Sequence, residues 1–294
     1  PPDPPDPPTP VTQFTFESDQ FVGHQNNNME VDGVHGWLHD GQGLAGPDRG
    51  PQLVEYVDGV FEGPPTASTR QNWAIYFDGI NDYLEMKEVD NYALSCDSEN
   101  AGDFSLAAWC RTDRGDRDIT KPSPPPLSLG IIDPAPQPIP PLAILVSGRN
   151  KATGAYYFLG MDGDLVSGVW TDYSFAGVLD GGPISNLVLG SNGMLLDDWH
   201  HLAVVFDNGI VGSNDAVLRF YEDGVLEREE SGLPSIDCNV FDDKIHFTIG
   251  AGTCQSGNNK DVVCNLFRGW MDEVNFFAET LSEAQIIVLM DKIE

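Results

Sequence analysis

The chain has 294 residues, and its 15 basic and 46 acidic residues give a formal charge of −31. Such a negative charge repels phosphate backbones and anionic headgroups, so we expect neither nucleic acid binding nor membrane insertion. No apolar run of about eighteen residues occurs, which argues against a membrane-spanning helix. Hydrophobic residues make up 40% of the chain, enough for a substantial core.

The chain begins with a proline-rich arm, residues 1–11. Its prolines are Pro1, Pro2, Pro4, Pro5, Pro7, Pro8 and Pro10. Proline lacks the N–H that a strand interior needs, and a polyproline helix loses little entropy when it docks in a groove. We therefore expect the arm to pack on its own domain or on a neighbouring copy, and a neighbouring copy would make it an assembly device.

Residues 12–294 are expected to form one domain of short β-strands. Apolar segments bounded by turn residues predict strands over 14–16, 73–77, 83–86, 104–110, 143–147, 155–159, 165–170, 201–206, 217–221, 245–249, 262–267 and 271–277. Hairpin turns are predicted at Asp162-Gly163, Asn208-Gly209 and Asp223-Gly224. This pattern favours an antiparallel β-sandwich.

A second proline-rich segment, within 112–142, is expected to be a loop inserted between two strands. Its Ser123-Pro124-Pro125-Pro126 run is similar to the repeats of hydroxyproline-rich cell-wall glycoproteins, so O-linked glycans are one possible modification.

A single helix is predicted near the C-terminus. Ser282 and Gln285 have the spacing of a capping box, and Leu281 can contact Ile286 across the first turn.

The spacing of the cysteines is more typical of disulfides formed in an oxidising compartment than of a metal site. Because the chain also starts at Pro1, we expect a mature extracellular protein. The cysteines are Cys96, Cys110, Cys238, Cys254 and Cys264. Cys254 with Cys264, across a Gly/Asn-rich turn, is the first candidate disulfide, and Cys96 with Cys110 is the second. Cys238 would then be left over.

Three ordered motifs carry a family resemblance. They are Phe77-Asp78-Gly79-Ile80-Asn81-Asp82-Tyr83, Trp199-His200-His201-Leu202-Ala203-Val204 and Gly269-Trp270-Met271-Asp272-Glu273-Val274. Together they resemble the laminin-G-like, concanavalin-A-like jelly-roll family. The resemblance implies a two-sheet antiparallel β-sandwich with one short C-terminal helix. It also implies that His200 and His201 belong to a structural strand and face opposite sides.

The resemblance further implies a structural Ca²⁺ at the sandwich rim. The matching ligands are Asp78, the Gly79 carbonyl, Asp82 and Asp272, which are the hard oxygen donors that this ion selects. The alternative is that Asp78 and Asp82 shape a turn through Asx hydrogen bonds while Asp272 is a solvated strand end.

Carbohydrate binding is a second chemical hypothesis. In the 104–110 strand, Phe104, Leu106 and Ala108 are expected to face the core, which leaves Trp109 on the opposite face. Trp170 and Tyr173 could join Trp109 there in stacking on a sugar. The alternative is that these rings are buried packing.

No catalytic set is complete, because neither a Glu-x-Asp-x-Glu strand nor a Gly-x-Ser-x-Gly elbow occurs, so we expect no enzyme. Two functions therefore remain. The first is a secreted structural or adhesive subunit that polymerises with copies of itself into a fibre or surface layer through its arm. The second is a calcium-dependent, lectin-like module that binds a polysaccharide.

Overall fold

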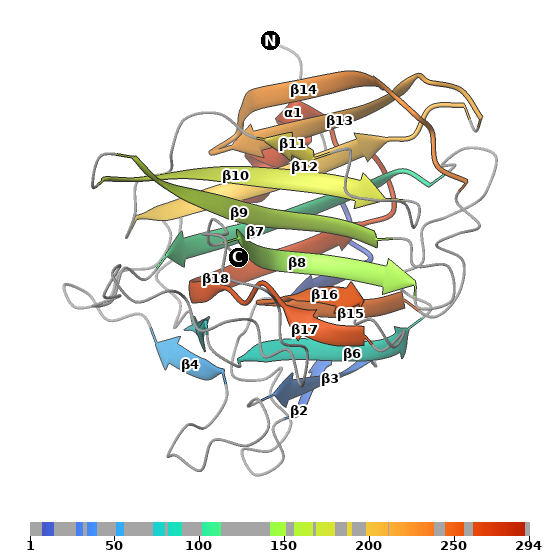
Figure 1. Cartoon of the computed structure of the whole chain (residues 1–294). Coiled ribbons are helices and arrows are strands. Elements are labelled where there is room, and N and C mark those ends of the chain that lie inside the picture. The colour runs from blue at the N-terminus through green and yellow to red at the C-terminus, as the bar shows by residue number, and fades with distance from the viewer. Residues whose placement is uncertain are drawn as a thin grey trace, which may run out of the picture.

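The computed structural model describes residues 8–14, 28–31, 34–39, 51–55, 73–79, 82–89, 102–112, 142–150, 156–166, 169–179, 187–189, 198–210, 212–237, 245–255 and 261–291. Two large antiparallel sheets lie face to face in this part of the chain (Figure 1). Neighbouring segments along the chain often lie in different sheets, as expected of a jelly roll. The predicted all-β sandwich is confirmed.

The first sheet, sheet A, has eight strands. Its order is β14 (Val225–Leu233), β13 (Ala216–Glu222), β12 (Trp199–Asp207), β7 (Phe104–Thr112), β18 (Arg268–Phe277), β5 (Trp73–Asp78) and β4 (Gln52–Glu55). The short strand β1 (Thr12–Phe14) also pairs with β18, beyond the stretch that pairs with β5.

The second sheet, sheet B, also has eight strands. Its order is β11 (Leu187–Leu189), β10 (Val169–Leu179), β9 (Tyr156–Val166), β8 (Leu142–Asn150), β15 (Ile245–Ile249), β6 (Tyr83–Val89), β3 (Val34–His39) and β2 (Asn28–Val31). A separate hairpin, β16 (Gly252–Gln255) with β17 (Asp261–Cys264), lies in front of β15 in Figure 1.

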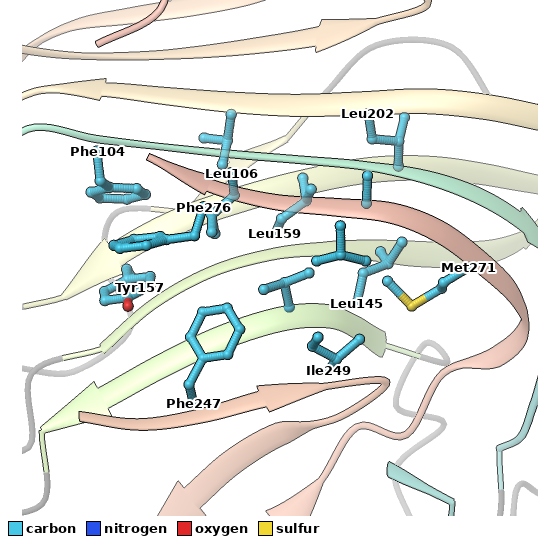
Figure 2. Packing of buried hydrophobic residues seen from close by; sticks show 14 of the residues in the cluster. Phe104, Leu106, Leu145, Tyr157, Leu159, Leu202, Phe247, Ile249, Met271 and Phe276 are labelled. Atoms are coloured by element: carbon cyan, nitrogen blue, oxygen red, sulfur yellow. The ribbon is translucent and has the colours of Figure 1, made fainter. Parts of the chain in front are cut away.

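The main core fills the space between the two sheets (Figure 2). Strand alternation supplies it, because every second residue of a strand points to the same face. On β7 these residues are Phe104, Leu106, Ala108 and Cys110. The Phe104 and Tyr157 rings lie 5.0 Å apart, and so join the two sheets. Gly148 permits this packing, because a Cβ atom there would lie 2.1 Å from the Tyr157 ring.

Strand β9 differs from its prediction. Asp162 and Gly163 were expected to form a hairpin turn, but both lie inside β9, which runs to Val166 and pairs with β10 over eleven residues. The prediction was wrong because a long ladder of cross-strand pairs outweighs the local turn preference of an Asp-Gly step.

The turn between β13 and β14 is the predicted Asp223-Gly224 hairpin. Asp223 and Gly224 have φ angles of 50° and 77°, as the two central residues of a type I′ turn require. The Asn208-Gly209 turn also lies between two strands, β12 and β13, although the connection extends to Asp215.

The helix α1 (Glu283–Asp291) is capped as predicted. The Gln285 amide donates to Ser282 Oγ at 3.3 Å, and Ser282 N donates to Gln285 Oε1 at 2.9 Å. Leu281 and Ile286 are both buried, and they pack with Tyr221 and Phe277 against the outer face of sheet A. Within the described residues, no helix is long and apolar enough to cross a membrane.

The described end of the arm packs on its own domain. Pro8 is buried, and Val11 N donates to Phe276 O at 2.8 Å. Phe14 enters the core and stacks on Phe247 at 6.4 Å. Pro1, Pro2, Pro4, Pro5 and Pro7 lie outside the described residues, as does 113–141 of the inserted loop between β7 and β8.

Candidate functional site

The predicted calcium ligands occupy two places. Asp78 ends β5, Gly79 follows it with a φ of 74°, and the buried Asp82 precedes β6. Asp272 lies in the middle of β18, four residues after Arg268, the register partner of Asp78. Four strand residues span about 13 Å, so the backbone does not bring Asp272 to the 78–82 turn. Asp272 Oδ1 instead accepts the Glu273 amide at 2.8 Å.

Trp109 is not available for sugar stacking. It does lie on the face opposite the main core, as predicted, but only 3% of it is exposed. Its ring packs edge-on against His201, with centroids 5.3 Å apart. Trp170 and Tyr173 lie on β10 of the other sheet, and their side chains are outside the described part. The three proposed stacking residues therefore do not share a site.

A row of polar side chains surrounds Trp109 on sheet A. His201 and Asp272 are its register partners on β12 and β18. Trp109 Nε1, His201 Nδ1 and Asn275 Oδ1 are buried and have no hydrogen-bond partner in the described part of the chain. Burial lowers the pKa of His201 to about 4, against the opposing attraction of Asp223. The imidazole is therefore neutral at pH 7, which fits the structural role implied for this strand.

The two cysteine predictions fare differently. Cys110 is a free thiol, buried in the main core, so the expected Cys96–Cys110 disulfide does not form. Its side chain belongs to the inward series of β7, where it packs between the sheets. Cys264 is disulfide-bonded. The side chain of Cys254, its predicted partner, lies outside the described part, as do Cys96 and Cys238.

A cluster of polar residues lies between the outer face of sheet B and strand β16, and we call it the outer polar cluster. Its members are Glu85, Ser147, Arg149, Tyr156, His246, Thr248 and Thr253. Glu85 Oε1 contacts His246 Nε2, and both side chains are almost fully buried. The residues come from β6, β8, β9, β15 and β16, so no local motif in the sequence announces the cluster. Sequence reasoning missed it entirely.

The β16–β17 hairpin and the turn that precedes it, which contains Ala251, accept hydrogen bonds from this cluster through backbone carbonyl groups. Thr248 Oγ1 donates to Ala251 O at 2.7 Å, and Arg149 Nη1 donates to Thr253 O at 3.3 Å. Burial raises the pKa of Tyr156 to about 12, partly offset by hydrogen bonds to Ser147 and Thr253. The tyrosine therefore stays protonated at neutral pH and acts as a hydrogen-bonding group.

Beyond the hairpin, the outward series continues along β9 and β10. Tyr156 and Phe158 lie on the outer face, with stacked rings 5.3 Å apart. Two-residue steps along β9 lead from Phe158 to Asp162, whose register partner on β10 is Tyr173. Trp170 pairs with Leu165 and so belongs to the alternate series. The backbone thus places an aromatic residue beside a carboxylate residue at Tyr173 and Asp162.

The chain was compared with known protein families, sequences and structures. No curated protein sequence matches the chain. Among solved structures, domain 4 of a Geobacillus stearothermophilus arabinanase in complex with arabinotriose is 14% identical, with a TM-score of 0.45, and covers 96% of this chain and 98% of its own. A Ruminococcus gnavus sialidase carbohydrate-binding module bound to α2,3-sialyllactose is 10% identical, with a TM-score of 0.42, and covers 74% of this chain and 96% of its own.

A Trypanosoma rangeli sialidase is also similar, at 15% identity and a TM-score of 0.45, and the match covers 96% of this chain and 33% of the sialidase. These likenesses include binding domains and an enzyme, and none decides whether this chain catalyses a reaction. The family model gives the sharper result. Residues 143–287, just under half of the chain, match the concanavalin A-like lectin/glucanases superfamily, which confirms the family resemblance. The matched segment spans β9–β18 and all but the first residue of β8, and it contains the second and third motifs.

Proposed function

We propose that this protein is a carbohydrate-binding module and that its sugar site lies on the outer face of sheet B along β9 and β10. Both strands fall within the segment that matches the lectin/glucanase family. The observation that carries the site is the register pair of Tyr173 with Asp162. An aromatic ring can stack on a sugar face, and an adjacent carboxylate can accept hydrogen bonds from sugar hydroxyls.

The neighbouring register pairs support this location. Asp164 pairs with Thr171, one step further along the same series, and adds a second carboxylate and a hydroxyl group. At the other end of the series lie the stacked rings of Tyr156 and Phe158. A row with aromatic residues at one end and carboxylate residues at the other suits a polysaccharide, whose sugar faces are apolar and whose edges carry hydroxyl groups.

A glycan array tests this proposal, with Tyr173→Ala compared against Ser174→Ala. The proposal expects the wild-type protein to bind one or more polysaccharides, and expects Tyr173→Ala to lose that binding by tenfold or more. Ser174 belongs to the alternate series, so its variant should bind as the wild type does. Unchanged binding by Tyr173→Ala, or no wild-type binding to any glycan, contradicts the proposal.

We also propose that the protein binds a structural Ca²⁺ ion, and we limit its ligands to Asp78, Gly79 and Asp82. These residues lie at the adjoining ends of β5 and β6, while Asp272 lies elsewhere on sheet A. A Ca²⁺ ion there would offset carboxylate repulsion in a chain with a charge of −31. EDTA should lower the melting temperature of the wild type and of Asp272→Asn, but not that of Asp78→Asn. An equal EDTA effect on all three contradicts this ligand set.

Self-assembly through the proline-rich arm is the second proposed function, and it now concerns residues 1–7. Residues 11–14 are already engaged with β18 and the core of the same chain. Pro8 is also buried, so the proposal is confined to the residues before it. Deleting residues 1–7 and measuring molar mass by light scattering tests the idea. Loss of higher-order species supports assembly, and an identical mass distribution for both proteins contradicts it.

A further inference from the structure

A second cluster of chemically active side chains lies at the rim of the sandwich, away from the proposed sugar site. His200 Nδ1 is 2.9 Å from Asp223 Oδ2 and 3.3 Å from Glu222 Oε1. One ligand atom from each residue lies within 4.8 Å of the others. His200 is the second residue of β12, Glu222 ends β13 and Asp223 begins the hairpin turn to β14. Within the described residues, it is the one group of this kind able to hold a metal ion.

This cluster is short of positive charge. The Nδ1 atom of an imidazole carries at most one proton and can donate it to one acceptor, here Asp223 at 2.9 Å. The Glu222 carboxylate faces the same nitrogen, and only 15% of its side chain is exposed. The negative charges of Asp223 and Glu227 also act on this carboxylate. A cation between the three groups would relieve this repulsion.

The two distances from His200 Nδ1 are close to those between neighbouring ligands of a small tetrahedral ion. Zinc holds nitrogen and oxygen ligands at about 2.0–2.2 Å, which places neighbouring ligand atoms about 3.3–3.6 Å apart in a tetrahedron. The distance from His200 Nδ1 to Glu222 has that value, and Asp223 would have to move away by about 0.5 Å. Imidazole with carboxylates suits zinc-class metals, whereas Ca²⁺ and Mg²⁺ prefer oxygen ligands alone.

The backbone holds the acidic ligand in place without any metal. Asp223 N donates to His201 O at 2.8 Å, and His201 N donates to Asp223 Oδ1 at 2.9 Å. One carboxylate oxygen of Asp223 is therefore held by the backbone of β12, and the other faces His200. The type I′ turn geometry of Asp223 and Gly224 fixes the position further. Such preorganisation lowers the entropy that metal binding would cost.

We propose that His200, Glu222 and Asp223 bind one zinc-class divalent cation, which joins the start of β12 to the β13–β14 turn. His200 contributes Nδ1 in its deprotonated form, so any proton on that atom is released on binding. Glu222 and Asp223 each contribute one carboxylate oxygen. A fourth position remains for water, as three protein ligands leave a tetrahedral ion incomplete.

Calorimetric titration of chelator-treated full-length protein with ZnCl₂ tests this proposal. We expect one equivalent of Zn²⁺ to bind, and Asp223→Asn to weaken binding at least tenfold. Asn-Gly is a preferred type I′ pair, so this variant keeps the turn while removing the carboxylate charge. Glu227→Gln is the matched control, because it removes a neighbouring negative charge without removing a ligand. Excess Ca²⁺ should not displace the zinc.

Two results overturn the proposal. One is a wild-type protein that takes up no Zn²⁺, and the other is an Asp223→Asn protein that binds it as tightly as the wild type. Circular dichroism melts show whether each variant is folded before titration, and Glu222→Gln provides a second ligand variant. Because the sugar site is on sheet B, glycan binding and zinc binding can fail independently.

Discussion

The outer faces of the two sheets are buried in different ways. On sheet A, helix α1 covers an apolar cluster that includes Tyr221, Phe277, Leu281 and Ile286. On sheet B, the β16–β17 hairpin and the turn before it cover polar side chains and accept their hydrogen bonds through backbone carbonyl groups. The first face is apolar, while the second brings together Glu85, Arg149 and His246 with hydroxyl groups.

The two kinds of covered face are expected to contribute differently to the stability of the folded state. Burying apolar surface stabilises the folded state by about 25 cal/mol per Å². Burying charged or polar groups costs desolvation energy that hydrogen bonds only roughly repay. The α1 face is therefore expected to contribute directly to stability. The hairpin face is expected to contribute little net stability, but to be intolerant of single changes.

Breaking the Glu85–His246 contact should have the largest effect. Both side chains are almost fully buried, and Glu85→Ala leaves His246 without its carboxylate neighbour. Removing one partner of a buried pair costs about 3–5 kcal/mol of unfolding free energy. Urea denaturation measures it. The double variant Glu85→Leu, His246→Phe should recover most of the loss, and a double variant as unstable as the single one would contradict this view of the hairpin face.

Truncating the helix anchor should cost slightly less. Ile286 is fully buried against sheet A, whereas its neighbour Ile287 is 39% exposed. Ile286→Ala is expected to lower the unfolding free energy by about 3 kcal/mol through lost burial and a cavity. Ile287→Ala should change it by less than about 1 kcal/mol. Equal losses in both variants would show that α1 does not pack as described.

The stability of the protein is expected to depend on pH through His201, a buried residue of sheet A. The pKa of His201 is about 4 in the folded protein, below its usual value of 6.5. Between these pH values the unfolded chain binds the extra proton, so stability rises with pH and levels off above about 6.5. The group contributes about 3 kcal/mol, which is lost as pH falls from 6.5 to 4.

Denaturant midpoints measured in EDTA from pH 4 to 7 check this slope. The His201→Gln variant removes the titrating group, so its stability should change less steeply over the window. If the two proteins show parallel pH profiles, His201 is not buried in its neutral form.

Removing the helix cap should have the smallest effect. Ser282→Ala deletes the hydroxyl that accepts a hydrogen bond from the backbone N–H of Gln285. Its loss is expected to lower the unfolding free energy by about 1 kcal/mol. In a thermal melt this appears as a modest fall in melting temperature. Ser231→Ala, on exposed strand β14, serves as the control and should leave the melting temperature unchanged.

Several elements could be predicted because their signals are local. The Ser282 and Gln285 pair defined the start of α1, and the Asp223-Gly224 step defined a type I′ turn. Strand alternation in 104–110 separated the core series from Trp109 correctly. It could not reveal that Trp109 is covered, because burial of an outer face depends on segments distant in sequence.

The polar clusters could not be predicted for the same reason. The motifs that contain His200 and Asp223 both stand out in the sequence, yet nothing in either indicates that the two side chains lie 2.9 Å apart. Asp78 and Asp272 were grouped because both follow family motifs, but the β5–β18 register separates them. The pairing register of the strands decides such distances, and it cannot be predicted from the few residues around each side chain.

By itself the sequence determined the fold class, the capped helix and the inward series of the core strands, because these depend on periodicity, turn residues and caps within a few positions. The tertiary structure alone decided which outward-facing residues are buried and which carboxylates meet an imidazole. Those outcomes depend on strand order and register, where a shift of one residue moves every side chain of a strand to the opposite face.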